Sequence, residues 1–376
     1  MKLLSGLAAV ALAATTLTLP SSASAATTDP TQRADDWIAA ELTDGLAVGQ
    51  YGADVGLSVD AGLALDATGR ADTAAAIGHA IGSRLVTSED VPYGYVSSDE
   101  YDFNPPYDFV QVGHYANATA KAAAFTQRIE RNPATAYPAV DLVDQLETLT
   151  DDATGVIADD SSFGNYANTI GQAFAAEALT VADSPEARAA ADALLAQQCP
   201  AGYFRFDLAA TACAADEAAP SPDTTGLAVL SLVESGDTSE AVTNAIADAT
   251  AWLESVQRPD GSLEGDASAP GSNANSTGLA AWALGSTGHD AAATRAAEVQ
   301  ARRNALLIVS LRERGRRRSP RSRRVRVRMT RRCRDQAGAR RGRRPSRATS
   351  VCRRSEGRRR HRRPPRRRTR TCPRRR

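Results

Sequence analysis

The sequence predicts an all-α protein built from stacked helix pairs, and three observations lead to that prediction. Residues 252–288 read as a helix end, a Pro-Asp-Gly turn, a polar loop and a second helix. Imperfect copies precede this unit at intervals of roughly 45 to 65 residues, which is typical of stacked supersecondary units. Residues 26–300 are rich in alanine and acidic side chains, with glycine and proline where turns are expected. About 275 residues suffice for one helical domain with a sizeable core.

Residues 1–25 have the pattern of an export signal. Lys2 supplies a positive start, residues 3–19 form an apolar core, and residues 23–25, Ala-Ser-Ala, match a small-residue cleavage site. Pro20 ends the apolar segment below the length that spans a membrane. We therefore expect signal cleavage after residue 25, a secreted or cell-surface location, and no transmembrane span in the mature chain.

The repeat is defined by the spacing of a glutamine, a glycine and the helix that follows them. The motif residues of the best copy are Trp252, Gln257, Gly261, Asn275, Gly278 and Trp282. Gln198 and Gly202 reproduce the glutamine–glycine spacing one unit earlier, and a helix then opens near Asp223. A weaker copy runs through Gly155 to a helix that opens near Asn168, and copies further upstream are degenerate. Asparagine, serine and threonine at these openings are favourable helix caps.

This pattern, joined to the segment NANSTGLAAWAL, resembles the prenyltransferase and squalene-oxidase repeat of terpenoid cyclases and protein prenyltransferases, in particular in secreted actinobacterial proteins. The resemblance covers residues 30–300 and is strongest in the last two copies. It implies an α/α toroid of about five helix pairs, with an inner ring of parallel helices inside an outer ring. The mouth of such a ring would be a concave site for a small molecule or a polymer.

Charge is distributed unevenly along the chain. Residues 1–300 contain 11 Lys and Arg against 41 Asp and Glu, although the whole chain has a formal net charge of +1. Such an acidic surface argues against nucleic acid and anionic membranes as partners of the helical domain. Its simplest interpretation is solubility.

Residues 301–376 contain 34 Arg, no Lys and three acidic residues. One interpretation is a disordered polycationic arm that binds nucleic acid, an anionic polymer or the cell envelope. We favour a shifted reading frame, because alanine codons in GC-rich DNA read as arginine or proline out of frame, and a selected basic arm would contain lysine. Cys333, Cys352 and Cys372 then have no role, and the helix pair expected after residue 290 is interrupted.

Cys199 and Cys213 are the only cysteines between residues 26 and 300. In an exported chain, two cysteines on either side of a turn-rich loop predict a structural disulfide. A loop of this size would contribute about 3 kcal/mol to stability. The family resemblance implies the same pair. A metal role would need further ligands, and none lies near these residues, so we predict no metal site and no cofactor.

Residues 92–109 are predicted to be the least helical part of the domain. The candidate ligand-binding residues in and just after this segment are Tyr93, Tyr95, Tyr101, Asp102, Tyr107, Asp108 and His114. Aromatic faces bury apolar or sugar surface, and carboxylates fix the orientation of a ligand. Two alternatives stay open: the segment packs its rings on the rim of the toroid, or His114 faces solvent at a helix start. The acidic residues lack the regular spacing of a calcium loop.

No catalytic residue is predicted. The sequence lacks the Asp-x-Asp-Asp motif of class II terpenoid cyclases, and no histidine lies beside a spare cysteine as in the zinc site of protein prenyltransferases. Paired carboxylates such as Asp159-Asp160 are interpreted as surface groups. The leading hypothesis is an exported, non-catalytic ligand-binding or cell-surface protein. The alternatives are an enzyme of the terpenoid cyclase, prenyltransferase or polysaccharide-active class, and a structural interaction repeat.

Overall fold

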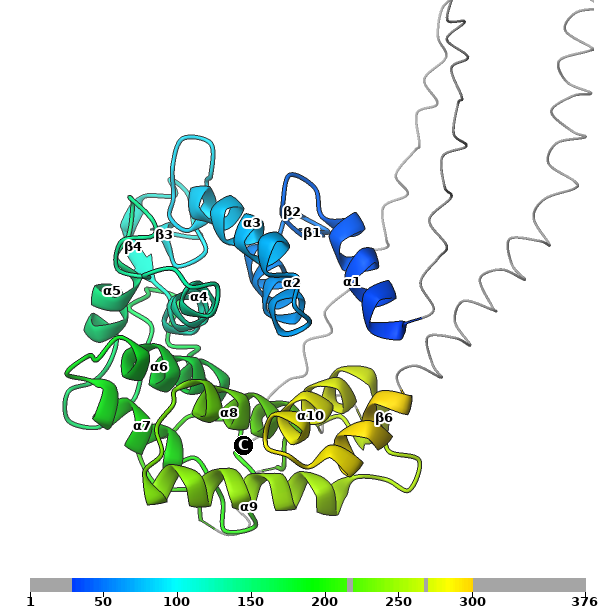
Figure 1. Ribbon diagram of the computed structural model, residues 1–376. Coiled ribbons are helices and arrows are strands. Elements are labelled where there is room, and N and C mark those ends of the chain that lie inside the picture. Colours follow the sequence, from blue (N-terminus) through cyan, green and yellow to red (C-terminus); the bar gives the residue numbers. More distant parts are fainter. Residues whose placement is uncertain (1–28, 215–218, 267–269, 300–376) are drawn as a thin grey trace, which may run out of the picture. The chain divides into compact units, whose positions relative to one another are not determined.

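The computed structural model describes residues 29–214, 219–266 and 270–299 (Figure 1). The predicted export signal and the Arg-rich tail lie outside these residues. The α-helices are α1 Pro30–Glu41, α2 Val55–Ala67, α3 Ala71–Ile81, α4 Ala116–Arg128, α5 Leu142–Thr148, α6 Thr169–Val181, α7 Ala187–Leu195, α8 Pro222–Glu234, α9 Glu240–Val256 and α10 Ala274–Ser286. The strands are β1 Val48–Gly49, β2 Gly52–Ala53, β3 Ser97–Tyr101, β4 Phe109–His114, β5 Leu263–Glu264 and β6 Ser272–Asn273, which form three antiparallel hairpins.

The helices form two rows. In the inner row, α2, α4, α6, α8 and α10 pack against one another in that order, and α3, α5, α7 and α9 each pack against an inner helix. Residues 290–299 form a further helix after α10. Figure 1 shows the inner row as an arc with the outer helices on its convex side. This is the predicted all-α toroid arrangement, with five inner helices among the described residues.

Polar side chains cap the N-terminal ends of the inner helices. The capping residues of α2, α6, α8 and α10 are Asp54, Asn168, Ser221 and Asn273, each of which accepts a backbone hydrogen bond from the first turn. Helix α4 lacks a cap of its own, and the carboxylate of Asp159 accepts from the N–H of Ala116 at 2.7 Å instead. These bonds satisfy donors that a helix start leaves without partners. The predicted openings near residues 168, 223 and 275 are confirmed to within two residues.

The Gln-x3-Gly motif ties each unit to the next outer helix. The amide of Gln257 donates to the carbonyl of Gly261 at 3.1 Å and to a carbonyl of the helix 290–299 at 3.0 Å. Gln198 donates in the same way to Gly202 at 3.0 Å and to a carbonyl of α9 at 2.8 Å. One side chain therefore joins the turn of its own unit to the outer helix of the next.

In the weaker copy, a glutamine at a different position makes the corresponding hydrogen bonds. Gln172, in inner helix α6, donates at 2.9 Å to the carbonyl of Gly155 and at 2.9 Å to a carbonyl of outer helix α7. Its amide oxygen also accepts from the N–H of Ile157 at 2.9 Å, a bond that the hydroxyl of Thr277 makes with Leu263 in the best copy. The sequence copy looks degenerate because its glutamine lies in the inner helix α6 and not before the glycine. The link from the turn to the outer helix is nevertheless kept.

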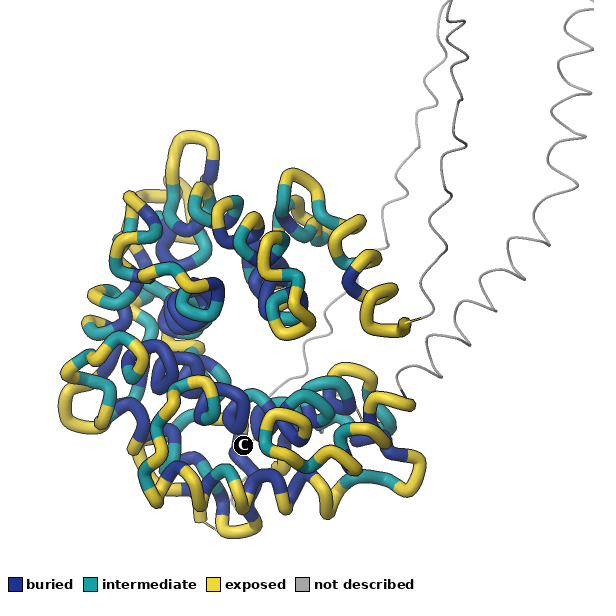
Figure 2. Tube along the Cα trace, in the orientation of Figure 1, coloured by how far each residue is buried: buried dark blue, intermediate teal, exposed yellow. Residues whose placement is uncertain are grey.

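Apolar side chains fill the space between and along the rows. One buried cluster is centred on α2, α4 and α6, with Phe125 fully buried, and a second is centred on α6, α8 and α10, with Phe204 fully buried. Figure 2 shows continuous burial along the inner row and exposure on the outer faces and loops. Stacked pairs thus bury apolar side chains along the whole inner row, as repeat architectures do. Among the described helices, none has the length and apolar character needed to cross a membrane.

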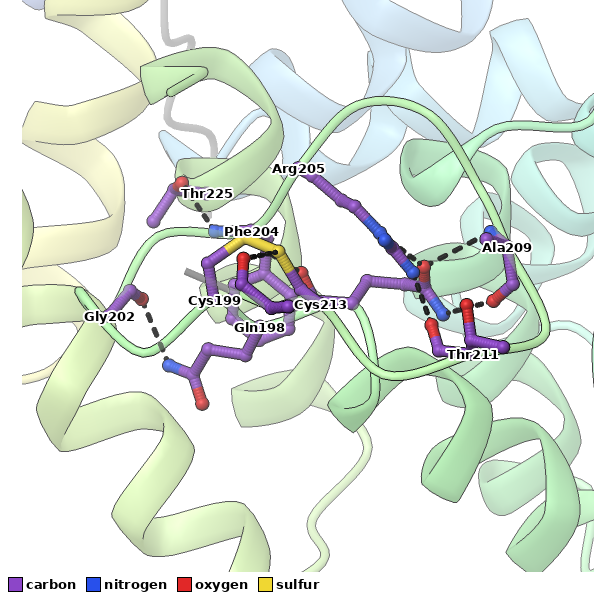
Figure 3. Close-up of a disulfide and its surroundings, with 11 residues drawn as sticks. Gln198, Cys199, Gly202, Phe204, Arg205, Ala209, Thr211, Cys213 and Thr225 are labelled. Atoms are coloured by element: carbon purple, nitrogen blue, oxygen red, sulfur yellow. Dashed lines mark hydrogen bonds between the residues drawn. A yellow bond between two sulfur atoms is a disulfide. The ribbon is translucent and has the colours of Figure 1, made fainter. Parts of the chain in front are cut away.

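The predicted disulfide between Cys199 and Cys213 is confirmed, and its Cα atoms are 4.8 Å apart (Figure 3). The loop that it closes folds around the buried guanidinium of Arg205. This group donates to the side-chain oxygen of Gln197 at 2.9 Å and to the carbonyl of Thr211. The loop therefore has an internal polar core as well as a covalent closure.

Candidate functional site

Most of residues 92–109 belong to a β-hairpin that connects α3 to α4. Strands β3 and β4 pair from Ser97 with His114 to Tyr101 with Phe109. The rings near its tip pack on one another, because Tyr101 meets Phe109 edge-on at 5.9 Å between ring centroids. Asp102 accepts hydrogen bonds from the backbone and side chain of Asn104 at 2.8 and 3.2 Å. The tip is therefore largely engaged with itself.

The structure separates the predicted ligand-binding residues into three places. Tyr101, Asp102, Tyr107 and Asp108 lie toward the hairpin tip, where the carbonyl of Asp108 accepts from the N–H of Asp102 at 2.9 Å. Tyr93 and Tyr95 lie before the hairpin and line a cleft, and His114 ends β4 and lines a different hollow.

Glu100 anchors the hairpin to the loop before α6. Only 1% of the residue is exposed, and its carboxylate accepts from the hydroxyl of Ser161 at 2.6 Å and from the N–H and hydroxyl of Ser162 at 2.7 and 2.6 Å. The phenol of Tyr115 adds a donor at 3.3 Å. Burial alone would raise the pKa of this carboxyl, but the hydrogen bonds outweigh burial and hold the pKa below its ordinary value.

We expect Glu100→Gln to weaken the folded state by about 2 kcal/mol near neutral pH, because buried donors lose a charged acceptor. A carboxyl whose pKa is lowered by folding stabilises the protein above the ordinary pKa of 4.5, and this contribution is lost as the pH falls through the folded-state value. The wild type should therefore lose stability below pH 4.5 more steeply than the variant. Urea unfolding curves at several acidic pH values measure this, and parallel pH profiles would contradict it.

A cleft of about 440 Å³ lies between the β1–β2 hairpin and the segment before β3. Its lining residues are Gly49, Gln50, Tyr51, Gly52, Ala53, Asp54, Val55, Arg84, Tyr93, Gly94 and Tyr95. Packing of α2 against α3 brings these two chain segments together. Tyr51 and Tyr93 are 95% and 78% exposed, so their rings stand at the edges of the cleft with little protein over them. We call this the tyrosine cleft.

Tyr95 also lines a second hollow of about 290 Å³ at the beginnings of α4 and α6. The other lining residues are Asn117, Ala118, Lys121, Asn168, Ile170, Gly171 and Phe174. Lys121 bridges α4 and α2 through an ion pair of 2.6 Å with Asp60 and a bond of 3.1 Å to the carbonyl of Gly56. We call this the inner hollow. It lies at the N-terminal ends of the inner helices α4 and α6.

Burial, followed by the charges of Asp60 and Asp54, raises the pKa of Tyr95. Its hydroxyl therefore stays protonated throughout the physiological range and can donate a hydrogen bond. A half-buried phenol between two hollows is a suitable contact for a ligand that occupies either one.

His114 lies against a hollow of about 450 Å³ whose other polar side chains come from Asp141, Asp144, Gln145, Thr148 and Asp160. Its backbone exchanges two hydrogen bonds with Asp160, at 2.7 and 3.0 Å. Its Nδ1 atom is buried and has no hydrogen-bond partner among the described residues. Asp102, another of the candidate ligand-binding residues, does not line this hollow. No group of three or more histidine, cysteine or acidic side chains in the described ranges is arranged to hold a metal ion.

The inner row also contains a buried ion pair that sequence reasoning missed. Arg128 at the end of α4 donates two hydrogen bonds of 2.7 Å to the carboxylate of Glu177 in α6, and the side chains are 8% and 2% exposed. The ring of Trp282 in α10 lies 6.0 Å from the guanidinium carbon. Spacing could not reveal this pair, because the partners are 49 residues apart on different units.

Two opposing effects act on each partner of this pair. Burial raises the pKa of the Glu177 carboxyl, although Arg128 opposes that shift. Burial also lowers the pKa of the Arg128 guanidinium, but Glu177 outweighs burial and the net pKa is raised. The charged guanidinium and the bidentate geometry describe an ion pair that bridges two inner helices.

No protein-family model matches the chain, and no curated protein matches it. Among solved structures, a protein from Actinoplanes is similar with a TM-score of 0.51 at 18% identity, covering 72% of this chain and 79% of that one. The type II terpene cyclase MstE from Scytonema gives a TM-score of 0.48 at 18% identity, covering 72% and 75%. The ent-copalyl diphosphate synthase from Streptomyces platensis gives 0.41 at 20% identity, covering 63% and 41%. At this identity the likeness to the Actinoplanes protein concerns the fold alone: the described chain is a helical toroid.

Proposed function

We propose that the chain is an exported ligand-binding protein that holds its ligand in the tyrosine cleft and the adjoining inner hollow. The observation that carries this proposal is that the two spaces, of about 440 and 290 Å³, share Tyr95 in their walls. Both lie where inner helices begin: the tyrosine cleft at the start of α2, and the inner hollow at the starts of α4 and α6. Clefts that combine apolar walls with a few polar side chains are the usual form of ligand sites.

The walls of the inner hollow support binding of a small molecule or one residue of a polymer. Ile170 and Phe174 supply apolar surface, while Asn117, Asn168 and Lys121 supply polar groups. Lys121 has three N–H donors, and two of them are used by Asp60 and the carbonyl of Gly56. The remaining donor could bind a ligand oxygen without breaking the ion pair.

Thermal unfolding in the presence of a chemically diverse compound library would identify a ligand, and titration calorimetry would measure its affinity. We expect Tyr95→Leu to reduce the affinity for a hit at least tenfold, and Tyr166→Ala to leave it unchanged. Tyr166 is a suitable control because it is 71% exposed and lines neither space. If hits bind both variants as tightly as the wild type, the proposed site is wrong.

Export is a separate part of the proposal and has its own test. The support is the charged start, apolar core and small-residue cleavage pattern of residues 1–25. The intact mass of the protein secreted by its native host should match a chain that begins at Ala26. C-terminal peptide mapping of the same sample would show whether peptides from residues 301–376 are present. Retention of the full chain inside the cell would contradict export.

A second candidate function is an enzyme that acts on a small molecule inside the ring. One observation favours it: Glu177 places on an inner helix a buried carboxyl whose pKa is raised by burial, against the opposing effect of Arg128. Product formation from the library compounds, followed by mass spectrometry, would test this candidate. Turnover that disappears in Glu177→Gln while the folded state and binding persist would favour the enzyme over the binding protein.

A further inference from the structure

The polar groups around the tyrosine cleft have hydrogen-bonding capacity that the described protein does not use. Arg84 forms no ion pair with the residues that the structure describes. Asp54 uses Oδ1 to cap α2 at Leu57, at 2.9 Å, and its Oδ2 faces the backbone of Gly49. The hydroxyl of Tyr95 lies beside Gly56 and makes no hydrogen bond within the described ranges. Arg84, Asp54 and Tyr95 therefore line one cleft with unused hydrogen-bonding capacity.

The apolar contribution comes from ring faces. Tyr51 in the β1–β2 turn and Tyr93 before β3 both line the cleft, although each ring is mostly exposed. Exposed aromatic rings at a concave surface offer their flat faces to a ligand. Gly52 adds no side chain, and a Cβ there would meet nothing within 4 Å, so the backbone of that wall is open to a ligand.

We infer that the ligand of the tyrosine cleft is a carbohydrate, and this inference rests on the proposed binding function. Sugar rings have an apolar face of C–H groups that stacks on tyrosine, and hydroxyl pairs that accept from or donate to planar groups such as guanidinium and carboxylate. One positive and one negative side chain, Arg84 and Asp54, offset each other and match a neutral ligand. A purely apolar ligand would leave these groups without partners, which is costly.

The arrangement also assigns a role to each side chain. Tyr51 and Tyr93 stack on sugar rings at the two edges, while Arg84 and Asp54 hold hydroxyls between them. Tyr95 is shared with the inner hollow, so it contacts the sugar residue nearest to that hollow. A cleft with exposed edges suits an internal stretch of an oligosaccharide, because the chain can continue past both tyrosines.

The test uses the mature protein and named carbohydrates. Pull-down on insoluble cellulose and chitin, affinity electrophoresis in soluble starch and xylan, and calorimetry with cellohexaose and chitohexaose are run side by side. We expect binding to at least one of these carbohydrates, a loss of affinity of tenfold or more in Tyr93→Ala and in Tyr51→Ala, and near-wild-type affinity in Tyr93→Phe, which keeps the ring. Tyr166→Ala is the control for a lost exposed tyrosine.

The outcomes separate this inference from the proposed function. If none of the carbohydrates binds, but a library compound binds and Tyr95→Leu abolishes that binding, the ligand-binding function stands and the carbohydrate inference is wrong. If neither carbohydrates nor library compounds bind, both are wrong. If a carbohydrate binds equally to Tyr93→Ala, Tyr51→Ala and the wild type, the cleft is not its site and the inference falls.

Discussion

Glu177→Ala is expected to lower the free energy of unfolding by about 3–5 kcal/mol, because it leaves the guanidinium of Arg128 buried without its counter-ion. The two hydrogen bonds of 2.7 Å join α4 to α6, so their loss also removes a polar link between neighbouring inner helices. Urea denaturation followed by circular dichroism measures the change. The urea concentration at the midpoint of unfolding should fall. The slope of the unfolding free energy against urea concentration should change little.

A surface pair provides the matched control for this prediction. Arg188 and Asp192 in α7 form an ion pair of 2.8 Å, but their side chains are 78% and 54% exposed. Solvent screens such a pair, so Asp192→Ala should produce no measurable loss. Glu177→Leu combined with Arg128→Met should recover much of the stability lost by Glu177→Ala, because it removes both buried charges. A Glu177→Ala variant as stable as Asp192→Ala would show that burial of the pair is unimportant.

The parts of the fold that the sequence predicted are those whose signals are local. Helices α8 and α10 begin beside capping residues and follow a glycine turn. The short sequence spacing that includes Gly202 and Gly261 is therefore enough to find them. The disulfide was predicted for the same reason, since its loop is short and both cysteines lie in one unit. A local pattern is enough when the residues that satisfy a structural need are close in the chain.

The candidate site depended on contacts between distant segments, and this is why much of it was missed. Tyr93 and Tyr95 were singled out from the aromatic segment, but Tyr51 and Arg84 come from separate parts of the chain and have no motif. The sequence does not distinguish Glu100 from the neighbouring acids, because Ser161 and Ser162, which donate to its carboxylate, are 61 and 62 residues away in the chain. Composition showed that residues 92–109 were not helical, while the pairing of β3 with β4 needed the fold.

Gly202→Ala is expected to destabilise the protein by about 2–4 kcal/mol, because two costs add at this position. The residue has φ +99°, which side chains with a Cβ rarely adopt. A Cβ would also overlap the backbone of Asp248 in α9, the outer helix to which Gln198 ties this turn. The substitution would therefore push apart two elements that the repeat holds in contact.

Gly236→Ala separates these two costs. Gly236 also has a positive φ, of +70°, but a Cβ there meets nothing within 4 Å. Its substitution should cost only the backbone strain, about 1–2 kcal/mol. Because Gly155 and Gly261 have positive φ and meet the next outer helix in the same way, Gly261→Ala should behave like Gly202→Ala. Equal urea midpoints for Gly202→Ala and Gly236→Ala would show that close approach to the outer helix is not what requires glycine in the repeat.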